Sequence, residues 1–509
     1  MNKKLTFLLL TAGLLLSGCA KGPYDIEGTV TVAEPESPFV SFNIWLKIGS
    51  QNDPKGKEGL AALTAALLDS GSTTANSYEQ ILEKLYPMAS GYSASIDKEM
   101  TNFTGRVHVD NLEPFYELFK EAVLSPAFVE NDFNRVKTQT MNYLRQMRRY
   151  SSDEELGKEL LFREIFRGTP YEHPEEGYVS SVDSLTLEDV KGFYQSHYLR
   201  GNVVVGLAGN YPADFPQRVR NDFDSLPEGQ TPEVEFPMPA PIEGVNVLIV
   251  DKPTQATAIS IGYPIALLRN SPDFPAMMLA NSWLGEHRKS SGHLYQVIRE
   301  TRGMNYGDYS YIEAYPMGHR RSLPPTNVNR RQQIFQIWIR PISMQKPGDL
   351  HDRALFATRA ALRASSKLID GGLPTEALEI TQGFLRSYTV NFGATLSDRL
   401  GYRIDDQFYG MPDPGYLESI RPSLARLTLD EVNEAIGKYL QNEDMWIVFI
   451  TANAEGFKQK LLSGDPTPIE YAGEKPESVL EEDKEIMSFP IPVSEDRIQI
   501  IGITDVFEN

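Results

Sequence analysis

The order of apolar and polar residues predicts strands and long helices that follow one another in a similar order twice along the chain. Period-two alternation indicates strands, and apolar residues three to four apart indicate helices. In the first half these patterns predict strands at 40–48 and 101–109, a helix at 59–68 and long helices from 112 to about 150. In the second half they predict strands at 245–251, 258–263 and 333–340, a helix near 276–284 and long helices from 353 to about 392. Each half is therefore expected to be an α+β domain, with a mostly antiparallel sheet packed against helices.

A short internal repeat supports this division into halves. The sequence LTLEDV at 185–190 returns as LTLDEV at 427–432, 242 residues later. Each copy precedes a helical stretch and then an apolar strand, at 203–205 and at 446–450. Repetition at a fixed offset is typical of duplicated structural units, so the two halves are expected to share one fold and to face one another.

A proline-rich segment separates the halves. Prolines interrupt regular structure at five positions, Pro227, Pro232, Pro237, Pro239 and Pro241. The predicted domains are residues 35–227 and 245–456, with a linker at 228–244, a tether at 19–34 before the first domain and an extension at 457–509 after the second. Within the extension, the acidic run 481–485 predicts a solvated loop, and the alternating segment near 497–503 predicts an edge strand.

The amino terminus has the pattern of a bacterial lipoprotein signal. Lys3 and Lys4 precede an apolar run at 5–16 that is too short for a membrane span, and small residues then lead to Cys19. We expect residues 1–18 to be removed and Cys19 to be lipidated, which would anchor the protein in the cell envelope. The outer membrane, facing the periplasm, is the expected location. A soluble secreted protein and an uncleaved signal anchor are the alternatives.

Composition restricts the chemistry further. Cys19 is the only cysteine, so the mature chain has neither a disulfide nor a thiolate ligand. The net charge is −20, and without Lys3 and Lys4 the balance is 47 basic against 69 acidic residues. This argues against a nucleic-acid partner. Two groups of basic residues are expected to be solvated charges, and they are Arg145, Arg148 and Arg149, and Arg320, Arg321, Arg330 and Arg331.

Residues 291–309, SGHLYQVIRETRGMNYGDY, carry Arg299 and Tyr306 seven positions apart. This segment resembles a substrate-binding motif of the M16 (pitrilysin or insulinase) zinc peptidases, and the resemblance extends over about residues 35–455. It implies two halves that close as a clamshell, with Arg299 and Tyr306 binding the substrate backbone and the oxygen on which charge develops. A guanidinium and a phenol can both donate hydrogen bonds to such an oxygen. The alternative is an ordinary helix surface and strand packing; Arg302 is expected on the surface and Tyr309 and Tyr311 in the core.

The zinc motif of the same family is absent. Aligning its flanking residues with GLAALTAALLDSGS places Ala62, Ala65 and Ala66 at the first histidine, the glutamate and the second histidine, and Tyr143 near the third ligand. Methyl groups cannot coordinate zinc. Elsewhere, His173 and Glu176 are followed by Gly177 and do not restore the motif. No metal or other cofactor is therefore expected in this chain.

The segment SGYSAS at 90–95 matches the region where the family offers an edge strand to an extended substrate, although an ordinary strand is an equal alternative. Nucleophile-elbow, phosphate-loop and dinucleotide motifs are absent.

Our leading hypothesis is that the chain is a non-zinc subunit of a heteromeric M16 peptidase and is inactive alone. Its Arg299 and Tyr306 would bind a peptide substrate at the zinc site of a partner chain that carries the zinc motif. The alternative is a membrane-anchored binding or assembly protein without proteolysis. An independently active zinc enzyme is a third possibility, and it requires stoichiometric zinc in the purified chain.

Overall fold

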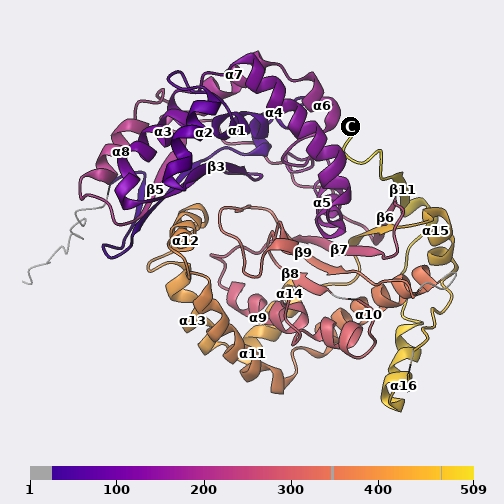
Figure 1. Ribbon diagram of the computed structural model, residues 1–509. Helices are drawn as coiled ribbons and strands as arrows, with labels where there is room; N and C mark the ends of the chain where they lie inside the picture. Colours follow the sequence, from indigo (N-terminus) through magenta and orange to yellow (C-terminus); the bar gives the residue numbers. More distant parts are fainter. Residues whose placement is uncertain (1–25, 306, 345–348, 472) are drawn as a thin grey trace, which may run out of the picture.

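A computed structural model describes residues 26–305, 307–344, 349–471 and 473–509. The chain forms two halves, each built on one sheet, and the halves face one another across a central space (Figure 1). The first half contains β1 Thr29–Ala33, β2 Phe39–Leu46, α1 Leu60–Ser70, α2 Tyr78–Leu85, β3 Gly91–Ile96, β4 Thr101–His108, α3 Leu112–Leu124, α4 Glu130–Asn142, a π-helix Tyr143–Arg148, α5 Asp153–Ile165, α6 Val179–Ser184, α7 Leu187–His197, β5 Val203–Gly209 and α8 Phe215–Phe223.

The second half repeats this order. It contains β6 Val245–Asp251, β7 Ala258–Ile265, α9 Phe274–Gly285, a π-helix Tyr295–Glu300, β8 Asp308–Tyr311, β9 Gln333–Ile339, α10 Asp349–Gly371, α11 Thr375–Tyr388, α12 Leu396–Tyr409, α13 Tyr416–Arg426, α14 Leu429–Tyr439 and β10 Met445–Thr451, followed by α15 Ala454–Ser463, α16 Glu477–Ile486 and β11 Ile498–Gly502. Residues 228–244, between the halves, contain no helix or strand.

The two sheets have the same topology. The first has the strand order β1-β5-β2-β4-β3, and the second has β6-β10-β7-β9-β8 with β11 added beside β6. In both, the first two strands of that order are parallel and the other three neighbours are antiparallel. The helices α7 and α14, and the strands β5 and β10, begin 242 residues apart. The duplicated α+β fold and the clamshell arrangement predicted from the sequence are therefore confirmed.

Each half covers its sheet with a helix from the other half. Helix α5 lies on the second sheet, where Leu156 and Leu160 join one buried cluster with Leu248 and Ile450. A methyl group at Gly157 would lie 2.7 Å from the hydroxyl of Ser260, so only glycine allows this close approach.

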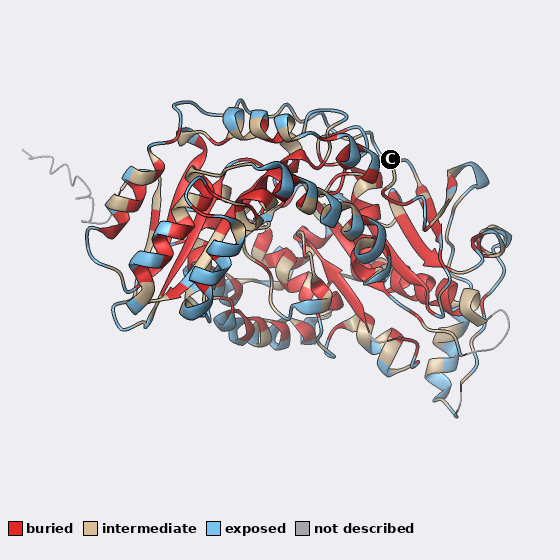
Figure 2. Ribbon diagram, turned by 45° about the horizontal axis from the view of Figure 1, so that its top comes forward, coloured by how far each residue is buried: buried red, intermediate tan, exposed pale blue. Residues whose placement is uncertain are grey.

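Helix α12 of the second half lies on the first sheet in the same way. Its Leu400 and Ile404 pack with Val30, Trp45 and Val204. Both sheets are buried over most of their length (Figure 2), and burial of each such aliphatic side chain contributes about 2 kcal/mol. This helix exchange, α5 on the second sheet and α12 on the first, joins the halves through their cores.

Three segments near the chain ends bear on the sequence predictions. The expected tether at 19–34 contains β1, which pairs with β5 because its alternating residues complete the first sheet. The acidic run 481–485, expected as a solvated loop, lies in α16. The expected edge strand near 497–503 is confirmed as β11.

Cys19 and the apolar run before it lie outside the described residues, and among the described helices none is long and apolar enough to cross a membrane.

The last residues of the chain return to the first half. Val506 and Phe507 are buried between the halves, and Phe507 accepts a backbone hydrogen bond of 2.8 Å from Val179 at the start of α6. Arg149 donates to the carbonyl of Val506 at 2.7 Å and pairs with Glu508. This C-terminal segment therefore fastens the second half to the first.

Candidate functional site

A cavity of about 230 Å³ lies between the two halves. The first half contributes the end of β3, the π-helix residues Tyr143 and Arg148, one side of α5, and Glu175 and Glu176; the second half contributes the segment 314–336. The cavity therefore lies at the place where the sequence predicts a substrate chamber, and its walls carry both carboxylates and cations.

Arg148 is the centre of the charged groups on the first-half side. One guanidinium nitrogen, Nη2, lies 3.3 Å from Glu159, 3.3 Å from Glu175 and 3.2 Å from Glu176. Burial alone would lower the pKa of Arg148, but these three carboxylates raise it well above its usual value. Arg148 and its neighbour Arg149 were expected to be solvated, and both predictions are wrong because each side chain finds carboxylate partners across the fold.

Arg330 connects the second half to the same carboxylates. It donates two hydrogen bonds to Asp97, of 2.6 and 2.9 Å, and one of 3.1 Å to Glu175. Lys98 lies 3.2 Å from Glu175 on the other side. Arg330 was also expected to be solvated, yet it is buried, because a planar guanidinium can bind one carboxylate through two parallel hydrogen bonds.

The two adjacent glutamates titrate in opposite directions. For Glu175, burial is outweighed by Lys98, Arg330 and Arg148, which hold its pKa below the usual value. For Glu176, burial raises the pKa, and the charge of Glu175 adds to this effect while Arg148 opposes it. Arg330 of the second half therefore forms buried ion pairs with Asp97 and Glu175 of the first half.

The residues at the zinc positions offer no side chain that binds a metal. Ala62 and Ala65, 8% and 2% exposed, are buried in α1, which packs against α4 just before Tyr143. Tyr143 lines the cavity, and its pKa is raised by burial and by Glu176, so the phenol stays neutral. Three methyl groups and a neutral phenol do not fit zinc. Among the described residues, no three histidine, cysteine or acidic side chains are placed to hold a metal ion.

Strand β3 forms the edge of the first sheet, as expected for 90–95. Tyr92, Ala94 and Ile96 pack toward the core, whereas Ser93 and Ser95 are exposed. The backbone N–H of Ala94, however, already donates a 3.0 Å hydrogen bond to the Asp69 carboxylate on α1. One of the groups that an added strand would use is thus occupied from within the chain.

Arg299 lies at the end of the π-helix Tyr295–Glu300, half-buried, with its guanidinium 5.2 Å from the centre of the Tyr295 ring. Burial raises the pKa of Asp308 and of Tyr309 on β8, and the positive charge of Arg299 lowers both values in part. Glu154 on α5 of the first half also raises the pKa of Tyr309, whereas Arg299 is not among the residues that line the central cavity. Tyr306 lies outside the described residues. Tyr309 and Tyr311 are buried, as expected.

Arg302 is buried, and the prediction of a surface charge is wrong. It donates 2.8 Å hydrogen bonds to Glu482 and to Asp483, both on α16. Lys475 donates to the carbonyl of Thr301 at 2.5 Å. The C-terminal extension therefore braces the turn that carries Arg299. Sequence reasoning missed this contact because the acidic run and Arg302 are about 180 residues apart.

Comparison with known families agrees with this architecture. Residues 29–177 match the family model for insulinase (peptidase family M16), and residues 184–340 match the model for the M16 peptidase inactive domain. The chain belongs to peptidase family M16.

Individual relatives are distant. A Helicobacter pylori protein named a non-peptidase homolog is 22% identical over 459 residues, which cover 89% of this chain and 99% of that protein. An uncharacterized zinc protease of Rickettsia felis is 24% identical over 299 residues, 57% of this chain and 69% of the relative. Among solved structures, an M16 peptidase inactive domain from Pseudomonas fluorescens aligns with a TM-score of 0.71 at 23% identity, covering 84% of this chain and 95% of that one. These relatives share the M16 fold with this chain, whose zinc positions carry no metal-binding side chains.

Proposed function

We propose that this chain is the non-zinc subunit of a heteromeric M16 metallopeptidase, which supplies Arg299 and Tyr306 to the zinc site of a partner chain. One observation carries the proposal: Ala62, Ala65, Ala66 and Tyr143, at the metal positions, offer no zinc ligand, while the turn that follows the π-helix of Arg299 is held by ion pairs from Arg302 to α16. The zinc and the hydrolytic water then belong to the partner, and this chain alone is inactive.

Arg299 and Tyr306 are suited to stabilise charge in the transition state. Donors that are already oriented toward a developing oxyanion lower the barrier without reorganisation, and loss of one costs about 10²- to 10³-fold in kcat. A lipid at Cys19 would keep the complex at the outer membrane, on the periplasmic side, where it would meet exported peptides.

Purification of the full chain from its native host, with whatever zinc-motif M16 chain accompanies it, tests the proposal. In the reconstituted complex, Arg299→Ala and Tyr306→Phe should each lower kcat for peptide hydrolysis about 100-fold, since each removes one oxyanion donor. Arg386→Ala, an exposed arginine at the end of α11, is the matched control and should leave kcat unchanged. Hydrolysis that is unaffected by both changes would reject the assigned roles.

A second candidate function is a binding or assembly protein that uses the clamshell without proteolysis. Two features favour it: the charged groups of the central cavity are paired with one another, and Asp69 already accepts the hydrogen bond of Ala94 on the edge strand. If the native complex contains no zinc-motif chain and no stoichiometric zinc, this second function replaces the first. Chelator-sensitive cleavage by the purified chain alone would contradict both.

A further inference from the structure

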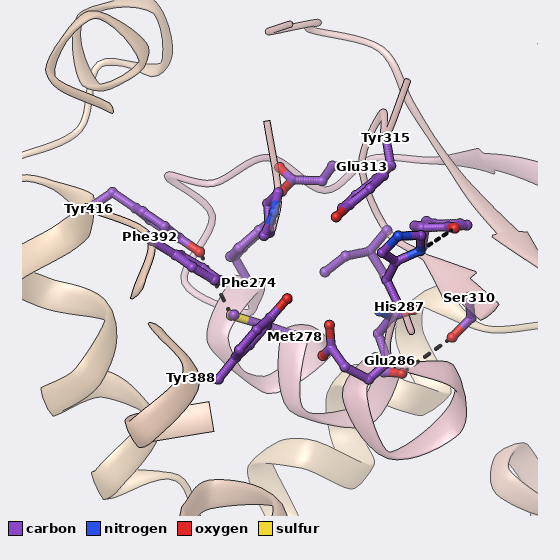
Figure 3. Close-up of a pocket in the computed structure, with 14 residues that line it drawn as sticks. Phe274, Met278, Glu286, His287, Ser310, Glu313, Tyr315, Tyr388, Phe392 and Tyr416 are labelled. Carbon is purple, nitrogen blue, oxygen red and sulfur yellow. Dashed lines mark hydrogen bonds between the residues drawn. The ribbon is translucent and has the colours of Figure 1, made fainter. Parts of the chain in front are cut away.

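A second, smaller cavity of about 50 Å³ lies inside the second half, beside α9 (Figure 3). Its walls are mainly aromatic, and they include Phe274, Tyr315, Tyr388, Phe392 and Tyr416. Figure 3 shows the hydroxyl groups of Tyr315 and Tyr388 and the carboxylate of Glu286 directed toward one space. Aromatic faces together with a carboxylate form an environment that attracts a cation.

The polar atoms of this cavity are mostly acceptors. Asn281 Oδ1 and the hydroxyl of Tyr315, a residue only 8% exposed, are buried and have no hydrogen-bond partner among the described residues. Tyr388 donates its hydroxyl proton to the carbonyl of Ser322 at 2.7 Å, so its oxygen can only accept a further bond. Buried polar atoms without partners are costly, so Asn281 Oδ1 indicates a missing donor, whereas the Tyr315 hydroxyl can donate as well as accept.

One of the two carboxylates of the cavity has no ion-pair partner among the described residues. Glu313 is bound by Arg269 at 2.8 and 3.2 Å, whereas Glu286 has no cation within 4.0 Å among the described residues. Burial raises the pKa of Glu286 to about 7, against the opposing effects of Ser282 and Lys289. A bound cation would lower the pKa of Glu286 toward the usual value of a carboxyl group.

We propose that this cavity, formed by Glu286, Asn281, Tyr315 and the surrounding rings, binds the primary ammonium group of a lysine side chain or of a free alkylamine. An ammonium group has three N–H donors and no acceptor, which matches the acceptors present. The volume suits one such head group, since a water molecule occupies about 30 Å³. The larger, planar guanidinium of arginine needs more room. The ring of Tyr388 already faces an ammonium of this chain, with Lys289 Nζ 4.9 Å from its centre.

Tyr315 separates the proposed site from the central cavity, because it lines both the small cavity and the cavity between the halves. On this proposal, a polypeptide between the halves would direct a lysine side chain past Tyr315 toward Glu286. The choice of a peptide lysine rests on the proposed function, whereas the ammonium site itself does not.

Calorimetric titration of the full chain with n-butylammonium tests the site, and n-butanol of the same shape is the uncharged comparison. Glu286→Gln should weaken n-butylammonium binding at least 10-fold and Tyr315→Phe severalfold, because each removes a partner of the ammonium. Glu434→Gln, an exposed glutamate on α14, is the matched control and should bind like the unmodified chain. Affinity should also fall between about pH 8 and about pH 5.5, as Glu286 becomes protonated.

Two capped pentapeptides, one with a central lysine and one with norleucine, distinguish the sources. If the chain binds the lysine peptide more tightly than the norleucine peptide, and Glu286→Gln removes this preference, the ligand is a peptide lysine. If the two peptides bind equally while n-butylammonium binds tightly, the ligand is a free amine. Equal affinity for n-butanol, or unchanged n-butylammonium binding in a Glu286→Gln protein with an unchanged melting curve, overturns the site. This result would leave the Arg299 and Tyr306 assignment untouched, and failure of that assignment would leave the ammonium site untouched.

Discussion

Asp308, at the start of β8, is a buried acid whose charge is only partly compensated. Its side chain is inaccessible to solvent, Asn305 donates to one oxygen, and the other oxygen has no partner among the described residues. Burial raises its pKa to about 7, while Asn305 and Arg299 oppose the increase. Asp308 therefore reports on the nearby charge of Arg299.

Protonation of Asp308 should therefore make the folded protein more stable in mild acid than at neutral pH. In the unfolded chain Asp308 releases its proton near pH 3.9, whereas the folded chain retains it up to about pH 7. The resulting stabilisation is complete below pH 3.9 and is lost as the pH rises through 7, with a maximum of about 4 kcal/mol. Asp308→Asn should remove this dependence, measured as the difference in free energy of unfolding from the unmodified chain between about pH 5 and about pH 8. A difference that stays constant over this range would contradict the pKa.

Buried charges are the residues that the sequence predicted least well. Arg148, Arg149, Arg302 and Arg330 were all expected in solvent, because charged side chains usually are exposed. For Arg330 the partners are distant in sequence, since Asp97 and Glu175 lie 233 and 155 residues away. Periodicity reports a local face and cannot identify such pairs, whereas the alanines at the zinc positions could be identified directly from the sequence.

At the level of elements, α16 acts as a brace for the turn after the second π-helix. The side chain of Arg302 is fully buried, and its carboxylate partners belong to α16. Removing one member of a buried ion pair leaves the other without compensation. Arg302→Ala should therefore lower the free energy of unfolding by about 3 kcal/mol and accelerate amide exchange in residues 296–305.

Lys484→Ala is the matched control for the brace. Lys484 lies on α16 as well, but its pair with Glu481 is exposed on both sides, and such pairs contribute at most about 0.5 kcal/mol. Equal effects of the two changes, or unaltered exchange in Arg302→Ala, would show that α16 does not hold the turn.

Strands with continuous apolar runs were predicted closely, and β6 has the bounds expected from the sequence. Among the elements that were not predicted, β1 and α16 were missed for different reasons. β1 is short and precedes the recognisable pattern of the first half, yet it pairs with β5 through the backbone. α16 carries an acidic run that favours solvent in isolation, but Arg302 and Arg363 neutralise it in the folded chain.

For the whole molecule, Arg330 is a buried polar link between the halves. Its two hydrogen bonds to Asp97 and one to Glu175 are buried at the central cavity. Arg330→Ala should lower the free energy of unfolding by about 3 to 5 kcal/mol and increase the radius of gyration measured by X-ray scattering.

The neighbouring residue provides the comparison for Arg330. Arg331 pairs with Glu99 at 3.2 Å, but its side chain is 58% exposed, so Arg331→Ala should cost less than about 1 kcal/mol and leave the radius of gyration unchanged. The same loss in both variants would argue against a specific link through Arg330.

The sequence repeat predicted the duplicated fold but not the helix exchange. The helices expected from the sequence end at about residues 150 and 392, before α5 and α12 begin, so the pattern could not say which sheet either helix covers. The three-dimensional arrangement alone reveals that each helix crosses to the opposite sheet.

This crossing has a consequence for how the chain is made. The first sheet is complete at Gly209, but α12, which covers it, begins only at Leu396. At ordinary rates of translation, about 10 to 40 s separate the two events. During that interval an apolar surface stays bare, and a ribosome that stopped before Leu396 would release a sticky fragment for chaperones to hold or proteases to remove.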